Sequence, residues 1–203
     1  MKNINHNFDQ LTEKEIINAL SANGDDDLKG FQNQDNLLKA SVLVPLLRNG
    51  NEWGLLFTRR TDTLQFHKGQ VAFPGGAADP GEIDPQTTAL RESFEEISLK
   101  PELVKILGCL PSMNSVTSYR ITPVIGIIQW PVELIPSPEE VQRIFTIPLE
   151  WLASSENRQM KPYQRKGGDI HQVIYYQPYE GEVVWGITAQ ITVNLLTILG
   201  LIK

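Results

Sequence analysis

The sequence predicts a mixed α/β domain in which helices cover the faces of one central β-sheet. Three observations support this prediction. Short apolar runs rich in Val, Ile and Leu recur along the chain and are typical of strands. Residues 85–97 instead show a helical distribution of apolar and acidic side chains. The chain has 203 residues, of which 41% are hydrophobic, so it is long enough for one well-buried core.

The N-terminal residues are polar and contain one helix signal. Thr12 and Glu15 have the spacing of a capping box, and apolar residues follow on one side. Residues 23–27 interrupt this pattern with Gly and acidic side chains. We therefore expect an accessory segment with a short helix over residues 1–38, and the main domain over residues 39–203.

Most of the expected strands follow this segment. Two apolar runs flank Asn49-Gly50-Asn51, a turn signal, and together they predict a β-hairpin. Pro74-Gly75-Gly76 ends the next strand. The expected strands cover residues 41–47, 54–58, 70–73, 105–110, 121–129, 144–147, 173–176 and 183–185.

Three helices are expected to cover the sheet. The first spans residues 85–97, and the second spans residues 148–153 with Pro in its first turn, where helices accept it. Residues 183–202 are apolar and nearly long enough for a membrane span. Polar residues are spread along this segment, however, and its apolar residues recur at helical spacing. We therefore expect a C-terminal helix packed on the core.

Composition excludes several classes of function. The formal net charge of −6 argues against a nucleic-acid surface, and a phosphate-bearing substrate would need local cations or metal ions to approach. Cys109 is the only cysteine, which excludes an intramolecular disulfide and a thiolate zinc cluster. The first ten residues are polar and show no secretory signal. We expect a cytoplasmic protein that binds neither nucleic acid nor membrane, and a homodimer is left open.

The helix over residues 85–97 carries the main chemical signal. A helical wheel puts its apolar residues on one stripe and three carboxylates opposite them: Leu90, Phe94 and Ile97 against Glu92, Glu95 and Glu96. Like charges at these spacings cost roughly 0.2–0.5 kcal/mol per pair, and Mg²⁺ or Mn²⁺ would remove this repulsion. The alternative is a solvated acidic face. The preceding Gly75-Gly76 favours the metal site, because glycines let backbone N–H groups approach phosphate oxygens.

The segment from Gly76 to Leu99 resembles the Nudix box. That box reads Gly, five residues, Glu, seven residues, Arg-Glu, an apolar residue, any residue, Glu-Glu, any residue, Gly and an apolar residue. Gly76, Glu82 and the run Arg91-Glu92-Ser93-Phe94-Glu95-Glu96 carry the likeness.

This chain departs from the box in three places. Eight residues separate Glu82 from Arg91, Ser93 replaces the apolar residue, and Ser98 replaces the Gly. The first departure leaves open whether Glu82 or Asp84 fills the role of the first glutamate. Ser98 alters the helix exit, where Gly would adopt a left-handed conformation more easily.

A second likeness covers roughly residues 40–200. Residues 56–76 are similar to the signature that precedes the box in coenzyme A diphosphatases of the Nudix superfamily. Further segments fit the same subgroup in the same order: 88–92, 110–111, 115–119, 122–124 and 184–189. The resemblance implies an αβα sandwich with a central mixed β-sheet. It also implies metal-dependent hydrolysis of the diphosphate bond of coenzyme A or its derivatives, giving 4′-phosphopantetheine and adenosine 3′,5′-bisphosphate.

The resemblance also implies roles for the charged residues of the box. Glu92, Glu95 and Glu96 would bind Mg²⁺ or Mn²⁺, and Arg91 would pair with a box carboxylate. The metal would lower the pKa of a bound water, which attacks one phosphorus in line. The general base is either a box glutamate or Glu140, whose alternative role is that of a surface acid.

Six residues outside these roles are expected to bind the substrate: Arg59, Arg60, Lys68, Gly75, Gly76 and Tyr119. The basic side chains would offset the acidic field around an anionic substrate. Since Arg59 and Arg60 are adjacent, only one of them can face a given side of a strand. For Tyr119, the alternative is a polar connecting loop.

Three functions remain open on these grounds. The first is a coenzyme A diphosphatase, and the second is a Nudix hydrolase of ADP-ribose, a dinucleotide or a nucleoside triphosphate. The third is a catalytically silent Nudix domain, against which the intact glutamates argue. The box specifies diphosphate chemistry and not the leaving groups. Gln65 stands where the coenzyme A signature commonly has an Arg, so we expect weakened affinity for coenzyme A.

Overall fold

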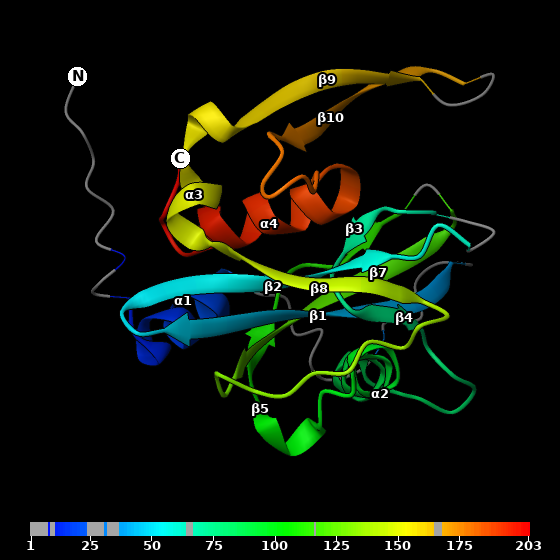
Figure 1. The fold of residues 1–203 in the computed structure, drawn as a ribbon, viewed down its shortest axis with the longest axis vertical. Helices are drawn as coiled ribbons and strands as arrows, with labels where there is room; N and C mark the ends of the chain where they lie inside the picture. The colour runs from blue at the N-terminus through cyan, green and yellow to red at the C-terminus, as the bar shows by residue number, and fades with distance from the viewer. Residues whose placement is uncertain are drawn as a thin grey trace.

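The computed structural model describes residues 8, 11–23, 31, 37–63, 67–115, 117–164 and 168–203. A mixed β-sheet lies between helices on both faces, which confirms the expected αβα sandwich (Figure 1). The elements in chain order are α1 (Glu13–Asn23), β1 (Leu38–Asn49), β2 (Glu52–Arg60), β3 (Val71–Ala72), β4 (Gly75–Ala77), α2 (Pro85–Ile97), η3 (Pro101–Leu103), β5 (Val104–Cys109), β6 (Met113–Asn114), β7 (Tyr119–Ile128), β8 (Val141–Pro148), α3 (Leu149–Ala153), η4 (Ser155–Asn157), β9 (Arg158–Gln164), β10 (Ile170–Tyr176) and α4 (Gly186–Ile198).

The sheet is built around β1 and β2. Its strand order is β3-β2-β1-β7-β5, while β4 pairs with β1, β6 with β7 and β8 with β2. β1 and β7 are parallel, with Ser41 opposite Thr122, and the other pairs are antiparallel. The predicted hairpin is confirmed, because β1 and β2 meet at a turn in which Gly50 has a φ of 62°.

Successive side chains of the central strands point to opposite faces of the sheet, and this divides the core into two clusters. In β2, Leu55 and Phe57 lie in the cluster that includes residues of α1, α3 and α4. Leu56, between them, lies in the cluster that includes residues of α2. Figure 1 shows α2 alone below the sheet, with α3 and α4 above it. This division leaves α2 beside β1 and β4, where the candidate site forms.

The two terminal helices pack into the first cluster. The capping box of α1 is present, since the Thr12 N–H donates to Glu15 Oε2 at 2.8 Å and the Glu15 N–H donates to Thr12 Oγ1 at 3.3 Å. Ile16 of α1 is fully buried in this cluster, as is Leu195 of α4. The expected C-terminal helix on the core is therefore confirmed, whereas the division of the chain at residue 38 stays a prediction.

Within the described ranges, no helix is both long enough and apolar enough to cross a membrane.

The strand predictions were least accurate near the C-terminal end. Residues 183–185 form no regular strand, because only isolated bridges, such as that between Tyr175 and Trp185, join them to β10. β9 was missed, since nearly all its side chains are exposed and its pattern is polar. Pro74-Gly75-Gly76 was expected to end a strand, whereas Gly75–Ala77 forms β4 by pairing with β1.

Candidate active site

The helix α2 begins and ends where its sequence predicts. Asp84 caps it, because the Thr87 N–H donates to Asp84 Oδ1 at 2.8 Å, and Pro85 follows in the first turn. At the other end, Ser98 adopts the left-handed conformation with a φ of 56°, and its N–H donates to the Phe94 carbonyl oxygen at 2.9 Å. Asp84 is thus committed to helix capping.

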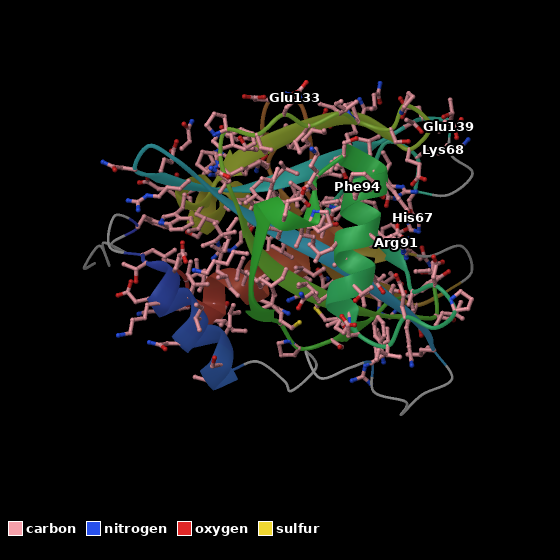
Figure 2. All side chains as sticks on the ribbon, turned by 90° about the horizontal axis from the view of Figure 1, so that it is seen from below. His67, Lys68, Arg91, Phe94, Glu133 and Glu139 are labelled. Atoms are coloured by element: carbon pink, nitrogen blue, oxygen red, sulfur yellow. The ribbon has the colours of Figure 1, made fainter. Side chains whose placement is uncertain are left out.

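The buried face of α2 differs from the predicted one. Phe94 is 50% exposed on the side turned away from the sheet, whereas Glu96 is only 3% exposed (Figure 2). The buried face is turned by about one residue position, roughly 100°, from the predicted apolar stripe. Its members are mostly small: Pro85, Thr88, Ala89, Ser93, Glu96 and Ile97. Small side chains let α2 approach β1 and β4 closely, so the apolar stripe was the wrong guide to its orientation.

Ser93 explains how a polar residue fits at this interface. Its Oγ is buried and donates to the Ala89 carbonyl oxygen one turn earlier, at 2.6 Å. The hydroxyl group is therefore satisfied within the helix and needs no partner in the sheet. Replacement of the apolar box residue by Ser93 is compatible with close packing for this reason.

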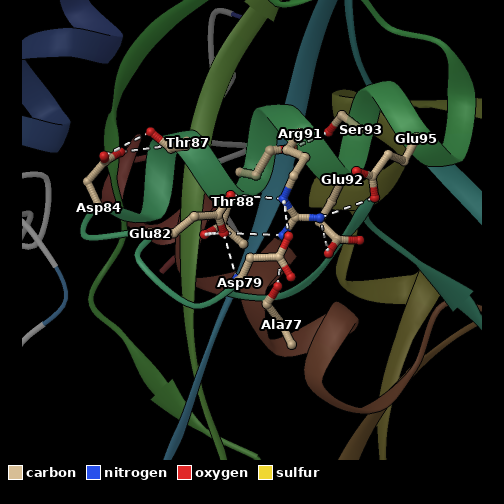
Figure 3. A network of polar contacts seen from close by, with 11 residues as sticks. Ala77, Asp79, Glu82, Asp84, Thr87, Thr88, Arg91, Glu92, Ser93 and Glu95 are labelled. Carbon is tan, nitrogen blue, oxygen red and sulfur yellow. Dashed lines mark hydrogen bonds and ion pairs between the residues drawn. The ribbon is translucent and has the colours of Figure 1, made fainter.

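Arg91 organises the loop between β4 and α2 (Figure 3). Its Nε donates to Glu82 Oε1 at 2.8 Å, and its Nη2 donates to Glu82 Oε2 at 3.2 Å. This bidentate contact lowers the pKa of Glu82 to about 2, with the hydrogen bond from Arg91 as the largest cause. The Nη2 group also reaches the Ala77 carbonyl oxygen at 3.0 Å. Glu82, and not Asp84, is therefore the partner of Arg91, even with one extra residue in the loop.

Arg91 also holds two glutamates of the helix. Its Nη1 lies 2.8 Å from Glu92 Oε1 and 3.1 Å from Glu95 Oε2. A residue that the sequence analysis missed completes the network, because Thr88 Oγ1 donates to Glu82 Oε2 at 2.7 Å. Thr88 precedes Arg91 by three residues on the same helix face, and this spacing was the signal available in the sequence.

Glu92 lies against the glycine turn. A Cβ atom added to Gly76 would stand 2.5 Å from Glu92 Oε2, so any other residue at position 76 would displace the carboxylate. Burial raises the pKa of Glu92, and the hydrogen bond from Arg91 opposes this shift. Gly75 is equally restricted, because its Cβ would lie 2.4 Å from the Ser41 carbonyl oxygen. Both glycines permit a close approach between β4, β1 and α2.

Glu96 is the most buried carboxylate of the box. Its Oε2 accepts a long hydrogen bond from the Gly75 N–H at 3.4 Å, and its Oε1 lies 3.5 Å from Arg60 Nη1. Burial raises the pKa of Glu96 to about 8, the charge of Arg60 opposes the shift, and the charges of Glu140 and Glu92 add to it. Glu96 therefore binds its proton more tightly than an exposed carboxylate would.

Glu140 belongs to this cluster. Its charge acts on both Glu92 and Glu96, although it lies more than forty residues further along the chain. Two backbone hydrogen bonds fix the loop of Glu140. The Ser137 N–H donates to the Glu96 carbonyl oxygen at 2.8 Å, and the Thr61 N–H donates to the Glu140 carbonyl oxygen at 2.9 Å. The structure thus brings Glu140 to the box, as its predicted role as general base requires.

The remaining predicted substrate residues lie further from the box. Arg59 faces away from Arg60 and pairs with Asp62 at 3.4 Å and with Glu182 at 3.7 Å. Lys68 lies in an exposed turn after β2, and Tyr119 is the first residue of β7. Glu182, which the sequence analysis missed, is a buried acid that holds Arg59. Gln65 lies outside the described residues.

The donors suit a hard divalent cation. Among the described residues, no three His, Cys, Asp or Glu side chains form a group that could hold a metal ion as they stand. Arginines instead contact Glu92, Glu95 and Glu96. These donors are all carboxylates, however, and burial is the largest cause of the raised pKa of both Glu92 and Glu96. A metal that prefers oxygen ligands, such as Mg²⁺ or Mn²⁺, fits this chemistry.

Comparison with known proteins identifies relatives over most of the chain. Residues 37–167 match the model of the NUDIX domain family. An uncharacterized Nudix hydrolase NudL of Enterobacter sp. (strain 638) is 41% identical over 168 residues, which cover 82% of this chain and 85% of the relative. The protein of the same name from Citrobacter koseri is 41% identical over 166 residues, covering 81% and 84%.

Solved structures show the same fold at lower sequence identity. A MutT/nudix family protein from Enterococcus faecalis has a TM-score of 0.55 and 14% identity, covering 84% of this chain and 70% of the other. A C. elegans Ap4A hydrolase in a binary complex has a TM-score of 0.48 and 23% identity, covering 55% and 80%. The first of these likenesses supports the fold.

Proposed function

The chain belongs to the Nudix hydrolase family, and from this premise we propose that it hydrolyses the diphosphate bond of coenzyme A or its derivatives. Family membership makes it a pyrophosphohydrolase that acts on a diphosphate substrate. The choice of coenzyme A rests on the likeness of residues 56–76 and of the later segments to coenzyme A diphosphatases. The proposed products are 4′-phosphopantetheine and adenosine 3′,5′-bisphosphate.

One observation carries this choice. Segments that resemble the coenzyme A subgroup are far apart in sequence, and the fold brings some of them into contact. Thr188, from residues 184–189, donates its buried hydroxyl to the Val71 carbonyl oxygen in β3 at 3.1 Å. Arg60, at the start of the same signature, reaches Glu96 of the box at 3.5 Å. The signature is therefore part of the site in space, which supports a role in substrate choice.

The chemistry follows from the charges in the site. Glu92, Glu95 and Glu96 would hold Mg²⁺ or Mn²⁺, and the family generally uses such a metal to activate water and to stabilise the leaving phosphate oxygen. Glu140 would accept the proton of the attacking water, because it lies near the box on a loop fixed by two backbone hydrogen bonds. Arg91 holds Glu82, Glu92 and Glu95 in place and thereby preserves the shape of the site.

A substrate panel tests this proposal. We expect kcat/KM with Mg²⁺ or Mn²⁺ to be highest for coenzyme A or an acyl derivative, with adenosine 3′,5′-bisphosphate as a product. ADP-ribose, a dinucleotide and a nucleoside triphosphate serve as competitors. If kcat/KM for one of these competitors exceeds that for coenzyme A by about tenfold or more, equivalent to about 1.4 kcal/mol, that competitor is the substrate and not coenzyme A. Binding of these compounds without any hydrolysis would indicate a catalytically silent domain.

Gln65 is the reason to include the other nucleotides. An Arg at this position would bind phosphate through a charge-assisted bidentate contact, which Gln cannot reproduce. We expect a high KM for coenzyme A, and we expect Gln65→Arg to lower it, since a charged hydrogen bond contributes roughly 1.5–3 kcal/mol. Measurement of KM for both forms checks this prediction. An unchanged KM would show that this position does not contact the phosphate.

A further inference from the structure

Arg60 and Arg91 both pair with glutamates of the box, but they differ in how fully their donors are used. Each of the three nitrogens of the Arg91 guanidinium has an acceptor within 3.2 Å. Arg60 has one ion-pair contact, at 3.5 Å to Glu96, and its Nε is buried without a hydrogen-bond partner among the described residues. Since a guanidinium carries five N–H donors, Arg60 keeps donors that the protein itself does not use.

Glu96, the partner of Arg60, has this long contact as its ion pair. The Glu96 side chain is only 4% exposed, and Glu92 and Glu140 both act on it as like charges. Arg60 is the one cation whose charge opposes them at Glu96 among the described residues. Because a buried carboxylate without a counter-ion is strongly unfavourable, Arg60 supplies the positive charge that the ionised form of Glu96 needs when no metal is bound.

The backbone places Arg60 between the acidic groups. The register of β2 against β8 shifts between Arg59 and Arg60, and Arg60 lies opposite Val141, which follows Glu140. Irregularities of this kind are common beside active sites, where they redirect a side chain. Because adjacent residues of a strand face opposite sides, Arg59 contacts Glu182 and Arg60 contacts Glu96.

We propose that Arg60 is an exchangeable counter-ion, which neutralises Glu96 in the metal-free protein, yields it to a divalent cation, and then donates to a non-bridging oxygen of the substrate diphosphate. The inference rests on the proposed function, which supplies the cation and the diphosphate. A dication and a guanidinium repel each other at one carboxylate, so the arrival of one weakens the hold of the other. Diphosphate oxygens then satisfy the donors of Arg60 that the protein leaves unused.

Titration with Mn²⁺ alone tests the first half of this inference. Arg60→Gln removes the competing charge, so we expect it to bind Mn²⁺ at least about threefold more tightly than the unchanged protein. Arg60→Lys keeps the charge, and Arg143→Gln removes a cation that pairs with Glu180 and Glu182 outside the site. Both should bind Mn²⁺ within about twofold of the unchanged protein.

The outcome of this titration is decisive in either direction. Equal or weaker Mn²⁺ binding by Arg60→Gln overturns the counter-ion role, as does an equal gain in Arg143→Gln, which would reflect net charge alone. If Arg60→Gln folds only when Mn²⁺ is present, the counter-ion role is supported. If it is unfolded with and without Mn²⁺, Arg60 is a structural residue and the inference is wrong.

A non-hydrolysable analogue tests the second half. With Mn²⁺ saturating, α,β-methylene-ADP should bind about tenfold more weakly to both Arg60→Lys and Arg60→Gln, because neither side chain reproduces the bidentate contact. Unchanged binding to both variants overturns this half. Failure of the proposed function would appear separately, as an unchanged protein that hydrolyses no compound of the panel, whereas the Mn²⁺ titration contains no substrate and decides the counter-ion role independently.

Discussion

At the scale of single residues, the site is held by the pairing of charges. Arg91 satisfies every nitrogen of its guanidinium and keeps Glu82, Glu92 and Glu95 in one network. Glu96 is different, because it is almost fully buried and has only the long contact to Arg60 as an ion pair. Two kinds of carboxylate therefore meet in one site: those held by close hydrogen bonds from Arg91, and Glu96, which has one long ion-pair contact to Arg60.

Glu96→Gln should separate catalysis from stability. We expect turnover to fall by at least roughly a hundredfold, because the change removes a proposed metal ligand with little change in volume. The folded state raises the pKa of Glu96 from 4.5 to about 8, so it binds the proton more tightly than the unfolded chain. The metal-free protein must then lose stability as the pH rises from 4.5 to 8. Glu96→Gln removes this loss and should be more stable at pH 8 by at least about 1 kcal/mol.

The measurements are steady-state turnover and urea unfolding of the metal-free protein across this pH range. Glu133→Gln is the matched control, because Glu133 is exposed and lies outside the site (Figure 2). Normal turnover in Glu96→Gln would remove this residue from the metal site. A stability difference that does not grow with pH would contradict the raised pKa.

Tyr176→Phe should stabilise the protein, most of all at high pH. The Tyr176 hydroxyl is buried without a hydrogen-bond partner in the described structure, and its removal should contribute about 1 kcal/mol. Burial also raises the pKa of Tyr176 from 10.0 to about 12, so the folded protein loses stability as the pH rises between these values. The variant should not show this loss. Unfolding of both proteins at neutral and alkaline pH, with Tyr163→Phe as an exposed control, checks the prediction.

At the scale of elements, α2 shows how the ends and the orientation of a helix have different causes. Its ends depend on local signals, namely the cap at Asp84 and the left-handed residue Ser98. Its orientation depends on which side chains are small enough to lie against β1 and β4. Consequently Phe94 is half exposed while Glu96 is buried, although hydrophobicity alone predicts the reverse.

Ser98→Gly should stabilise α2. A residue with a Cβ atom is strained at a φ of 56°, and Gly relieves this strain by about 1 kcal/mol after its larger loss of chain entropy. Ser98→Ala is the matched control, because it keeps the Cβ atom and should give no gain. Urea unfolding of the three proteins measures the effect. Equal stabilisation by Ala and Gly would show that the serine hydroxyl, and not the backbone conformation, is unfavourable.

At the scale of the whole molecule, one site is assembled from distant parts of the chain. The segment before the box, the box itself and Glu140 meet because the strand pairs bring β1, β2, β4 and β8 together, while Thr188 of residues 184–189 contacts β3. The two core clusters on either side of the sheet are made of apolar residues, and none of the box carboxylates belongs to either cluster. The core therefore does not depend on a metal ion.

Chelation should abolish activity and leave the fold intact. The donors are carboxylates, so turnover should require Mg²⁺ or Mn²⁺ and return when either is restored. Circular dichroism in excess chelator should show the same secondary structure and a cooperative unfolding transition, since both core clusters are apolar. Full turnover in chelator would sink the metal-dependent mechanism, and loss of structure would show that the metal is structural.

The sequence by itself determined much of the local structure. Turn residues, the capping box and alternating apolar runs predicted the first hairpin, α1, the limits of α2 and the C-terminal helix, because these signals act between neighbours in the chain. The pairing of Arg91 with a box carboxylate was predicted from the resemblance to the Nudix box, and the i+4 spacing put Glu95 within its reach. The family, its fold and its class of chemistry were also readable from the order of separated motifs.

Only the tertiary structure decided how these parts meet. Arg91 pairs with Glu82 and not with Asp84 because of the path that the loop takes. The eight residues between Glu82 and Arg91 do not determine this path by their sequence alone. The burial of Glu96, its contact with Arg60 and the presence of Glu140 beside the box depend on strands that pair across more than eighty residues. Such contacts depend on packing and on the charges of distant residues, and no periodicity along the chain records them.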